Sequence, residues 1–422
     1  MKITIPTWLL AVMILAILTL ALILWSVKRR RRPHLKLERG ALQDLMHSIA
    51  GLTQGTCVPG NRVELLHNGA LWDRLFEDMA AGKLTVNCEA FLSKEGELTR
   101  RLVSVLSAKA REGVQVRLML DGSGGKKFGK EGLREMTAAG VHVRHYHPML
   151  LVNLGLLNNR DHRKITVVDG SIGYVGGHCI TDEWLGEAQD KKHFRDITAR
   201  VEGPVVAQLQ SAFLENWIEE TGEVPGGPSF FPDLEEVGET AAHVVWLSPT
   251  GSPSTIEILH YVLIEAARER LTVQNPYFLP DPDARKALLE AVKRGVEVRV
   301  MLPAAHASDM PFTQHASHHH FGTLLKGGVK IFEYNRTLLH QKVLTIDGKC
   351  SSVGSTNFDD RSFEINDEAT MVVYDETIAR ELEETFEKDL EYATPVDLEE
   401  WKRRPFRHKL RDLFSFIFNE QL

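Results

Sequence analysis

Two stretches of the sequence carry the same reactive residue types at the same spacing. In each, one residue separates a histidine from a lysine, four residues separate the lysine from an aspartate, and six more lead to a pair of small residues. The first copy is His162, Lys164, Asp169 and Gly176-Gly177, and the second is His340, Lys342, Asp347 and Gly354-Ser355. Chance rarely places two such matches in one chain, so we interpret them as two halves of one catalytic site.

The apolar residues that follow each lysine predict a strand, over 165–168 in the first copy and over 343–346 in the second. Side chains alternate between the two faces of a strand, so a histidine and a lysine two positions apart share a face. If the two halves of the chain pack face to face, two imidazoles and two ammonium groups converge. Such a group of side chains is suited to phosphoryl transfer.

Each residue type has a task in such a transfer. The lysines neutralise charge on phosphate oxygens. One neutral histidine attacks phosphorus and forms a covalent adduct, and the other, protonated, delivers a proton to the leaving oxygen. A histidine with an unperturbed pKa of about 6.5 can do either at neutral pH. We therefore expect chemistry that needs no metal ion and no cofactor.

The elements that must position these motifs alternate between helices and strands. Helices are predicted over 75–81 and 98–111, and strands over 84–91, 114–120 and 141–146. The second half repeats this order; for example, 294–302 echoes 112–120. The alternation predicts an α/β layered fold whose sheet is mostly parallel, with a mixed sheet as the alternative. The segment 221–232, rich in glycine and proline, cannot hold a helix or a central strand and is expected to link the halves.

With the residues that follow them, the motifs resemble the pattern H-x-K-x4-D-x6-G-[GS]-x-N of the phospholipase D superfamily. The resemblance extends from about Gly60 to Tyr392, and the stretches 159–164, 213–217 and 275–281 are similar to bacterial cardiolipin synthases. It implies two similar α/β halves related by a pseudo-twofold, with the active site between them. It also implies a phosphatidyl–histidine intermediate and a reaction that converts two phosphatidylglycerols into cardiolipin and glycerol.

The resemblance also implies roles for individual residues. By position, His162 is the nucleophile and His340 the general acid/base, although the sequence alone does not order them. The candidate catalytic residues are His162, Lys164, Asp169, His340, Lys342 and Asp347. The candidate phosphate-binding residues are Lys164, Lys342, Asn357 and Ser355. Asp169 and Asp347 are expected to support the local fold rather than the chemistry.

Each imidazole also needs a carboxylate that orients it. Asp196 follows His162 by 34 residues and Glu368 follows His340 by 28 residues. We assign each carboxylate to the histidine that precedes it, with Glu364 as the alternative to Glu368.

The first motif departs from the pattern at its last position. Cys179 stands where the second motif has Asn357, and a thiol is a poorer hydrogen-bond donor than an amide. Either the remaining lysines, Asn357 and backbone groups suffice, or the first half binds the head group differently. His178 is a candidate to compensate, although a structural role for it is more common.

A cluster of histidines invites a metal hypothesis. It comprises His315, His318, His319 and His320. Three consecutive histidines cannot all face one way on a helix, and no acidic residue or cysteine is spaced nearby for a closed site. We therefore predict no metal site, and expect a loop or helix near the mouth of the active site.

Both ends of the chain suggest contact with a membrane. Residues 3–27 are almost wholly apolar; as a helix they would span roughly 37 Å at about 1.5 Å per residue, against about 30 Å for a bilayer core. The cluster 28–32, Lys-Arg-Arg-Arg-Arg, follows directly. A transmembrane helix is thus predicted over 3–27, with the rest of the chain on the cytoplasmic side of the inner (plasma) membrane. The basic cluster is expected to attract anionic lipid.

The C-terminal stretch 401–418 has apolar residues at helical spacing with Lys and Arg between them. This predicts a basic amphipathic helix, which either lies at the bilayer interface or packs on the domain. The predicted segments are a transmembrane helix over 3–27, a basic juxtamembrane linker over 28–59, a first half over 60–220, a linker over 221–244, a second half over 245–395 and the amphipathic segment over 396–422.

Composition restricts the class of function. The net charge is −7, yet two local clusters, at 28–32 and 402–411, hold eleven basic residues, so the rest of the chain is acidic. A nucleic-acid-binding protein would more often spread basic charge over its globular part. We expect phospholipid substrates, an anionic membrane surface and no nucleic acid. A phospholipase D or phosphodiesterase that uses water as acceptor is the main alternative, a superfamily nuclease the lesser one, and the oligomeric state stays open.

Overall fold

The computed structural model describes residues 6–27, 42–148, 159–247 and 254–417. The chain separates into two compact units, Met1–Lys36 and Leu37–Leu422.

The first unit contains one described helix, α1 (Thr7–Val27). Within the part of the chain that the structure describes, no helix is both long and apolar enough to cross a membrane. The transmembrane helix predicted over 3–27 is therefore not supported. The basic cluster at 28–32 lies outside the described residues.

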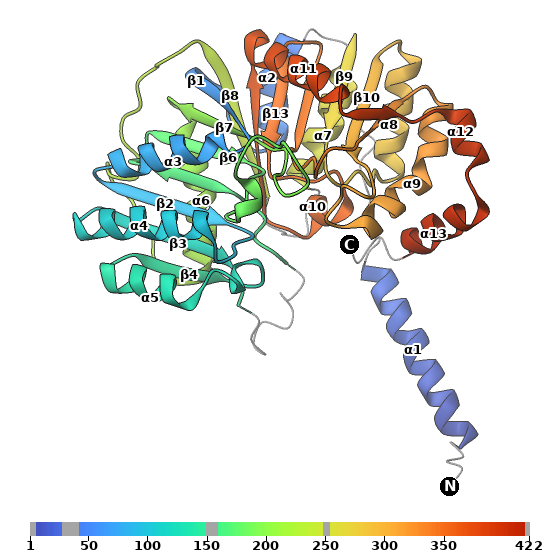
Figure 1. Ribbon diagram of the computed structural model, residues 1–422, viewed down its shortest axis with the longest axis horizontal. Helices are drawn as coiled ribbons and strands as arrows, with labels where there is room; N and C mark the ends of the chain where they lie inside the picture. Colours follow the sequence, from blue (N-terminus) through green and yellow to red (C-terminus); the bar gives the residue numbers. More distant parts are fainter. Residues whose placement is uncertain (1–5, 28–41, 149–158, 248–253, 418–422) are drawn as a thin grey trace. The chain divides into compact units, whose positions relative to one another are not determined.

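In the second unit the described strands form one continuous sheet (Figure 1). In sheet order they are β15 (Ala393–Pro395), β11 (Lys330–Tyr334), β10 (Glu297–Pro303), β9 (Arg270–Gln274), β12 (Val343–Ile346), β13 (Cys350–Gly354), β14 (Glu368–Tyr374), β8 (Thr240–Leu247), β1 (Val58–His67), β7 (Ile197–Glu202), β6 (Ile172–Gly176), β5 (Ile165–Val168), β2 (Thr85–Ala90), β3 (Gln115–Asp121) and β4 (His142–Tyr146).

The strand order is the same when counted inwards from either end of the sheet. The first half runs β4-β3-β2-β5-β6-β7-β1, and the second runs β11-β10-β9-β12-β13-β14-β8, with β15 added at the edge. Strand β1 pairs with β7 on one side and with β8 on the other, and so joins the halves. The fold is a mixed α/β fold built from two topologically equivalent halves.

Antiparallel pairs predominate, so the expectation of a mostly parallel sheet is wrong. Among the described strands, parallel pairing is confined to β2-β3-β4 and β9-β10-β11. The reason is that each motif strand turns straight back: β5-β6 and β12-β13 are hairpins. Their turns are Asp169-Gly170, with φ of 51° and 64°, and Asp347-Gly348, with φ of 53° and 60°. Two positive φ angles in succession match the twist of the flanking strands.

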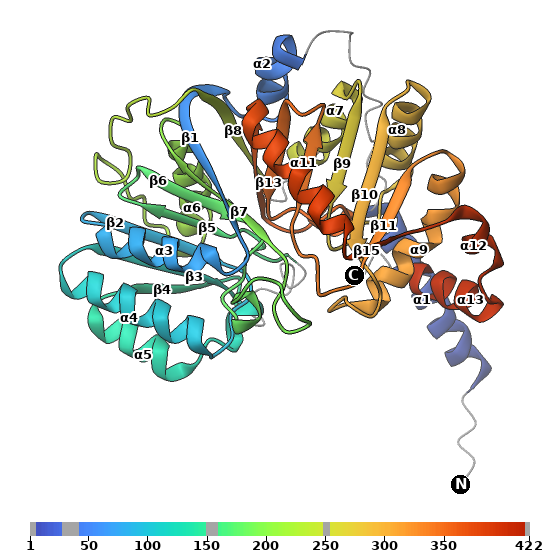
Figure 2. The same cartoon turned by 45° about the horizontal axis from the view of Figure 1, so that its top comes forward.

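Helices cover both faces of this sheet. They are α2 (Leu42–Leu52), α3 (Ala70–Ala81), α4 (Glu97–Arg111), α5 (Lys130–Ala139), α6 (Val206–Thr221), α7 (Thr255–Ala266), α8 (Pro282–Lys293), α9 (Pro311–Lys326), α10 (Asp360–Glu364), α11 (Glu376–Leu390), α12 (Leu398–Arg403) and α13 (Phe406–Ile417). In Figure 2, α11 lies in front of the strands of the second half and α7 behind them.

The predicted elements of the first half are present. The helices expected over 75–81 and 98–111 are α3 and α4, and the three expected strands are β2, β3 and β4. No helix or strand occurs over 222–239, where a linker was expected. The predicted linker 28–59 nevertheless contains α2 and the start of β1, and the predicted linker 221–244 contains the start of β8.

One apolar cluster extends across both halves. It joins residues of α6 and of strands β5 to β7, such as Trp217 and Val201, to residues of the second half, such as Val343 and Met371. A separate cluster fills the space between the sheet of the first half and helices α3 to α5. Because the first cluster is shared, burial of apolar surface holds the halves together.

Candidate active site

The two motifs place their reactive side chains just before the strands β5 and β12. All four are buried: His162, Lys164, His340 and Lys342 are between 5% and 8% exposed. The histidines and lysines therefore precede the strands that the sequence predicted and are not part of them.

Each imidazole is held by a carboxylate from the other half of the chain. His162 Nδ1 lies 2.9 Å from Glu368 Oε1, and His340 Nδ1 lies 2.7 Å from Asp196 Oδ2. The two predicted carboxylates are thus at the histidines, but the predicted pairing is wrong, because each partner belongs to the histidine of the opposite motif. Glu368, and not Glu364, contacts the ring.

Backbone contacts between the halves impose this exchange. The His162 amide donates to the Asp367 carbonyl oxygen over 2.9 Å, next to Glu368. The His340 amide donates to the Arg195 carbonyl oxygen over 2.7 Å, next to Asp196. In both places a motif segment runs parallel to a segment of the other half. The exchange of carboxylates between the halves therefore follows from the way their backbones pair where the two halves meet.

The carboxylates are themselves fixed. Trp184 Nε1 donates to Asp196 Oδ2 over 2.8 Å, and the Ser355 hydroxyl donates to Glu368 Oε2. Ser355 was expected to bind phosphate, but its hydroxyl is used to position Glu368. Because Nδ1 of each ring faces a carboxylate, Nε2 is the nitrogen left for a reacting group.

Aromatic edges enclose the two rings. Phe91 meets His162 edge-on at 4.8 Å between ring centroids, and Trp184 meets His340 edge-on at 5.0 Å. Sequence reasoning missed both aromatic residues. The only signal for Phe91 was its place directly after the buried strand β2. Trp184 had none, because it belongs to a 3-10 helix of three residues, Asp182–Trp184, which has no sequence periodicity.

The two ammonium groups are held next to the rings. Lys164 Nζ donates to the His162 carbonyl oxygen over 2.5 Å, and Lys342 Nζ donates to the His340 carbonyl oxygen over 2.6 Å. Lys342 Nζ also lies 2.8 Å from His340 Nε2. Burial, together with the charge of Lys164, lowers the pKa of Lys342 to about 8. The pocket is therefore a preformed cationic environment for an anion.

Burial and the lysines also act on the imidazoles. Burial, assisted by Lys164 and Lys342, holds the pKa of His162 well below its usual value. Burial and Lys342 lower the pKa of His340 to about 4. Both rings are neutral at pH 7, which is the state in which an imidazole nitrogen can attack phosphorus.

The two carboxylates differ from one another. Burial raises the pKa of Glu368 to about 7. Burial also opposes ionisation of Asp196, but the neighbouring His178 and His340 rings and Lys342 outweigh it and hold its pKa far below its usual range. The equivalent groups of the two halves therefore have unequal affinities for a proton.

The departure at Cys179 leaves a thiol in the pocket wall. Its Sγ is buried and lies 3.8 Å from the Gly177 carbonyl oxygen, and burial raises the pKa of the thiol. His178 does not replace the missing amide, because both of its nitrogens are occupied, one by the Thr198 hydroxyl and one by the Asn68 carbonyl oxygen, each at 2.8 Å. In the other half, Asn357 Oδ1 is buried and has no hydrogen-bond partner among the described residues.

The motif aspartates lie outside this pocket. Asp169 accepts the amides of Lys83, Leu84 and Thr85, and Asp347 accepts those of Arg268, Glu269 and Arg270. Each carboxylate thereby fixes the start of the strand that neighbours its own motif strand, β2 or β9. These are the contacts of structural side chains.

The chain matches a known protein family and curated relatives over most of its length. Residues 83–217 and 261–390 match the family described as "Cardiolipin synthase, PLD-like domain". The chain is 33% identical over 366 residues to a cardiolipin synthase of Geobacillus kaustophilus, which covers 86% of this chain and 72% of the relative. It is 31% identical over 381 residues to the major cardiolipin synthase of Bacillus subtilis, covering 89% and 79%.

Solved structures share the fold. A phosphatidylserine synthase from Haemophilus influenzae superposes with a TM-score of 0.63 at 11% identity, covering 87% of this chain and 98% of that one. A polyphosphate kinase from Porphyromonas gingivalis gives a TM-score of 0.54 at 14% identity, covering 88% and 53%. From the matched family and the curated relatives it follows that the chain is an enzyme that belongs to the cardiolipin synthase family of the phospholipase D superfamily.

Proposed function

We propose that this enzyme transfers a phosphatidyl group from one phosphatidylglycerol to another, which yields cardiolipin and glycerol. The observation that carries the proposal is the pair of crossed contacts, His162 with Glu368 and His340 with Asp196, beside two buried lysines. Relatives named cardiolipin synthases support the choice of substrate.

The first step forms a covalent intermediate. His162 Nε2 attacks the phosphorus of the donor, and the bond from phosphorus to the oxygen of the glycerol head group breaks. His340 is neutral in the empty site, and it takes up a proton from solvent when the anionic phosphate binds beside it. It then gives this Nε2 proton to the leaving oxygen, so glycerol leaves. The phosphatidyl group is then bonded to His162, and Glu368 stabilises the positive charge of the substituted ring.

The second step returns the enzyme to its starting state. A hydroxyl of the head-group glycerol of a second phosphatidylglycerol attacks the phosphorus, and His340 takes the proton of that hydroxyl. The phosphorus–nitrogen bond breaks, and its electron pair returns to His162. The product is cardiolipin, and His340 is protonated again for the next cycle.

The difference between the carboxylates supports this order of roles. Asp196 stays ionised, so it stabilises the imidazolium that a general acid at His340 requires. Burial keeps His162 neutral, as a nucleophile must be. Lys164 and Lys342 pair with the phosphate oxygens, whose negative charge in turn favours protonation of His340. Asn357 is proposed as a further phosphate contact, because its buried side-chain NH2 can donate to a phosphate oxygen.

We also propose that the enzyme acts on the cytoplasmic face of the inner (plasma) membrane, in contact with anionic lipid. Helix α13 supports this, since Phe406, Leu410, Leu413 and Phe414 are 44% to 77% exposed. Basic side chains stand between them, as in helices that lie at a bilayer interface.

A Phe406→Asp, Phe414→Asp double variant should float poorly with phosphatidylglycerol vesicles. Equal flotation of the variant and the original protein would contradict the membrane role of α13.

The reaction is tested with purified full-length enzyme in detergent and phosphatidylglycerol as the only lipid. Cardiolipin and glycerol in equal amounts are expected. Phosphatidic acid as the main product would instead indicate hydrolysis, and activity that survives in His162→Ala or His340→Ala would refute the two-histidine mechanism.

The nucleophile is identified with a donor whose leaving group needs no proton, such as phosphatidyl-p-nitrophenol. His340→Ala should release nitrophenol once and then stop, because it lacks the base for the second step. The peptide that contains His162 should then carry a phosphatidyl group by mass spectrometry. The reverse result, a modified His340 in His162→Ala, would exchange the two roles.

A further inference from the structure

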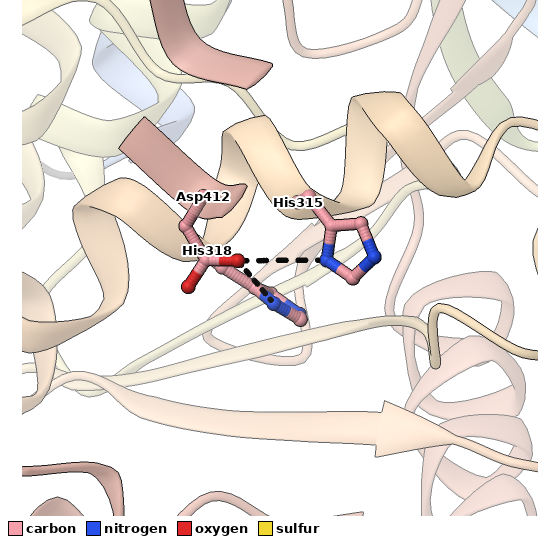
Figure 3. Close-up of side chains that lie close together, drawn as sticks. All are labelled: His315, His318 and Asp412. Carbon is pink, nitrogen blue, oxygen red and sulfur yellow. Dashed lines mark ion pairs between the residues drawn. The ribbon is translucent and has the colours of Figure 1, made fainter. Parts of the chain in front are cut away.

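A group of side chains that could ligate a metal ion lies away from the active site. His315 and His318, on α9, face Asp412, on α13 (Figure 3). One potential ligand atom from each residue lies within 4.8 Å of the others. Asp412 Oδ1 is 3.5 Å from His315 Nδ1 and 3.7 Å from His318 Nδ1.

These separations are too long for ordinary hydrogen bonds. Indeed His315 Nδ1 and Asp412 Oδ1 are both buried without a hydrogen-bond partner among the described residues, and the Asp412 side chain is 2% exposed. A buried polar atom without a partner costs roughly 1–3 kcal/mol, so the group calls for an explanation. Ligand atoms about 2.0–2.1 Å from a tetrahedral zinc ion stand about 3.3 Å apart. The two separations from Asp412 Oδ1, 3.5 Å and 3.7 Å, are close to this value.

The surrounding side chains orient the three ligand atoms toward one point, as binding of a single shared ion requires. His318 Nε2 lies 2.8 Å from Glu333 Oε1, which leaves Nδ1 facing Asp412. Arg404 Nη2 donates to Asp412 Oδ2 over 3.1 Å, which leaves Oδ1 facing the two rings. A carboxylate on the far nitrogen of a ligating imidazole is the usual outer partner in metal sites, since it fixes the tautomer and the ring orientation.

Space for a fourth ligand lies beside the group. A cavity of about 270 Å³ is lined by His318 and Asp412, and also by His408, Glu400 and Trp401. Three protein ligands with one position open to such a cavity are a known zinc arrangement, in which water takes the fourth place.

We propose that His315, His318 and Asp412 bind one divalent transition-metal ion, of which zinc fits best, and that this ion fastens α13 to α9. Imidazole nitrogens with one carboxylate suit zinc better than magnesium or calcium, which prefer oxygen ligands. The prediction that this histidine cluster binds no metal considered only residues nearby in sequence. Asp412 supplies the acidic ligand from a helix that folds back onto α9.

The proposal is independent of the transfer reaction, since none of its residues lies in the active site. It has a consequence for the protein surface, because α13 carries the exposed basic and apolar residues described above. The bound ion would set how firmly that helix is held.

Metal content tests the site directly. The full-length protein in detergent is stripped with a chelator, incubated with ZnCl₂, desalted and analysed by mass spectrometry for bound zinc. One zinc per chain is expected for the original protein. Asp412→Asn and His315→Ala should each retain zinc at least tenfold more weakly. His319→Ala is the matched control, since it removes a neighbouring imidazole of the same helix that is outside the group, and it should keep one zinc.

Two spectroscopic and biochemical measurements separate loss of the site from loss of the fold. Substitution with CoCl₂ should give the visible absorption of tetrahedral cobalt in the original protein and in His319→Ala, and not in Asp412→Asn. Zinc should also slow tryptic cleavage between Lys402 and Arg411 in the original protein. If the stripped protein takes up no stoichiometric zinc, or if Asp412→Asn binds it as tightly as the control, the three residues form only an ionic contact and the proposal is wrong.

Discussion

Asp196 and Glu368 occupy equivalent places in the two halves but differ in their affinity for a proton. Burial raises the pKa of Glu368 to about 7, whereas the pKa of Asp196 lies far below its usual range because His178, His340 and Lys342 favour its charged form. A site with two histidines needs such a difference, since one ring has to attack while the other transfers a proton. The asymmetry arises from the neighbours of each carboxylate and not from the motifs, which are alike.

The crossed contacts make different predictions for the two carboxylates. Asp196→Asn should impair His340, so with the activated donor it should form the phosphatidyl–histidine and fail to discharge it. Glu368→Gln should impair His162 and slow formation of the intermediate. Each rate should fall at least about a hundredfold. Single-turnover kinetics of the two variants check this. If Asp196→Asn instead slows formation of the intermediate and Glu368→Gln slows its discharge, each carboxylate serves the histidine that precedes it in the sequence.

The loss of activity at alkaline pH should follow the deprotonation of Lys342, the lysine of the second motif. Lys342 must be cationic to bind phosphate oxygens, and its cationic form is lost as the pH rises through a pKa of about 8. We expect kcat/KM to fall above about pH 8. Lys342→Arg should be slower but should keep its rate at higher pH, because a guanidinium stays charged. The pH profile of kcat/KM is measured for the original enzyme and for Lys342→Arg. If kcat/KM falls at the same alkaline pH in both, Lys342 is not the group whose deprotonation causes the fall.

At the scale of secondary structure, the motif aspartates link a hairpin to the start of the neighbouring strand. Asp169 occupies the first turn position of the β5-β6 hairpin, and its carboxylate accepts three amides at the start of β2. Asp347 does the same for the β12-β13 hairpin and β9. The aspartate of each motif therefore positions the catalytic strand without contact with the reacting groups.

Asp169→Asn should separate stability from chemistry. Asparagine tolerates the positive φ, but its amide nitrogen would replace the oxygen that accepts the Lys83 N–H over 2.8 Å. We expect the free energy of unfolding to fall by about 1–3 kcal/mol, with the activity per folded molecule unchanged. Thermal denaturation and active-site titration measure the two effects. Loss of activity without loss of stability would place Asp169 in the chemistry.

Local sequence patterns predicted individual helices and strands, but not the contacts between segments that are distant in the sequence. The helices α3 and α4 and the strands β2 and β3 follow from apolar periodicity, and the Asp-Gly pairs were an available signal for the hairpins that turn the sheet antiparallel. The crossed carboxylates could not be predicted, because they depend on two backbone bridges between segments that are distant in sequence. The same holds for Asp412, which meets His315 only because α13 folds back on α9.

At the scale of the whole molecule, the buried side chain of Arg163 joins the two halves through hydrogen bonds. The side chain is fully buried; Nη1 donates to the Ala212 carbonyl oxygen over 2.6 Å, and Nη2 donates to Glu215 over 2.6 Å and to the Leu247 carbonyl oxygen over 3.0 Å. Ala212 and Glu215 belong to α6 of the first half, while Leu247 ends β8 of the second. In the sequence Arg163 stands between His162 and Lys164, so one segment carries both the reactive groups and the contact that joins the halves.

Arg163→Met should destabilise the whole molecule. The buried Asp367, 3.8 Å from the guanidinium, would lose a cationic neighbour. Removing one partner of a buried ion pair typically costs about 3–5 kcal/mol. Arg62→Met is the control, because its contact with Glu202 is at 3.7 Å and its side chain is 61% exposed, so it should cost less than about 1 kcal/mol. Chemical denaturation measures both, and equal losses would show that Arg163 does not hold the halves together.

The exchange of carboxylates also determines what happens when the halves move apart. Separation at the junction would take Glu368 from His162 and Asp196 from His340 at the same moment, because each contact crosses it. Neither half could then keep an oriented imidazole. Reactivity is thus coupled to closure, and an enzyme opened far enough to admit bulk water would lose the base needed to pass its phosphatidyl group to that water.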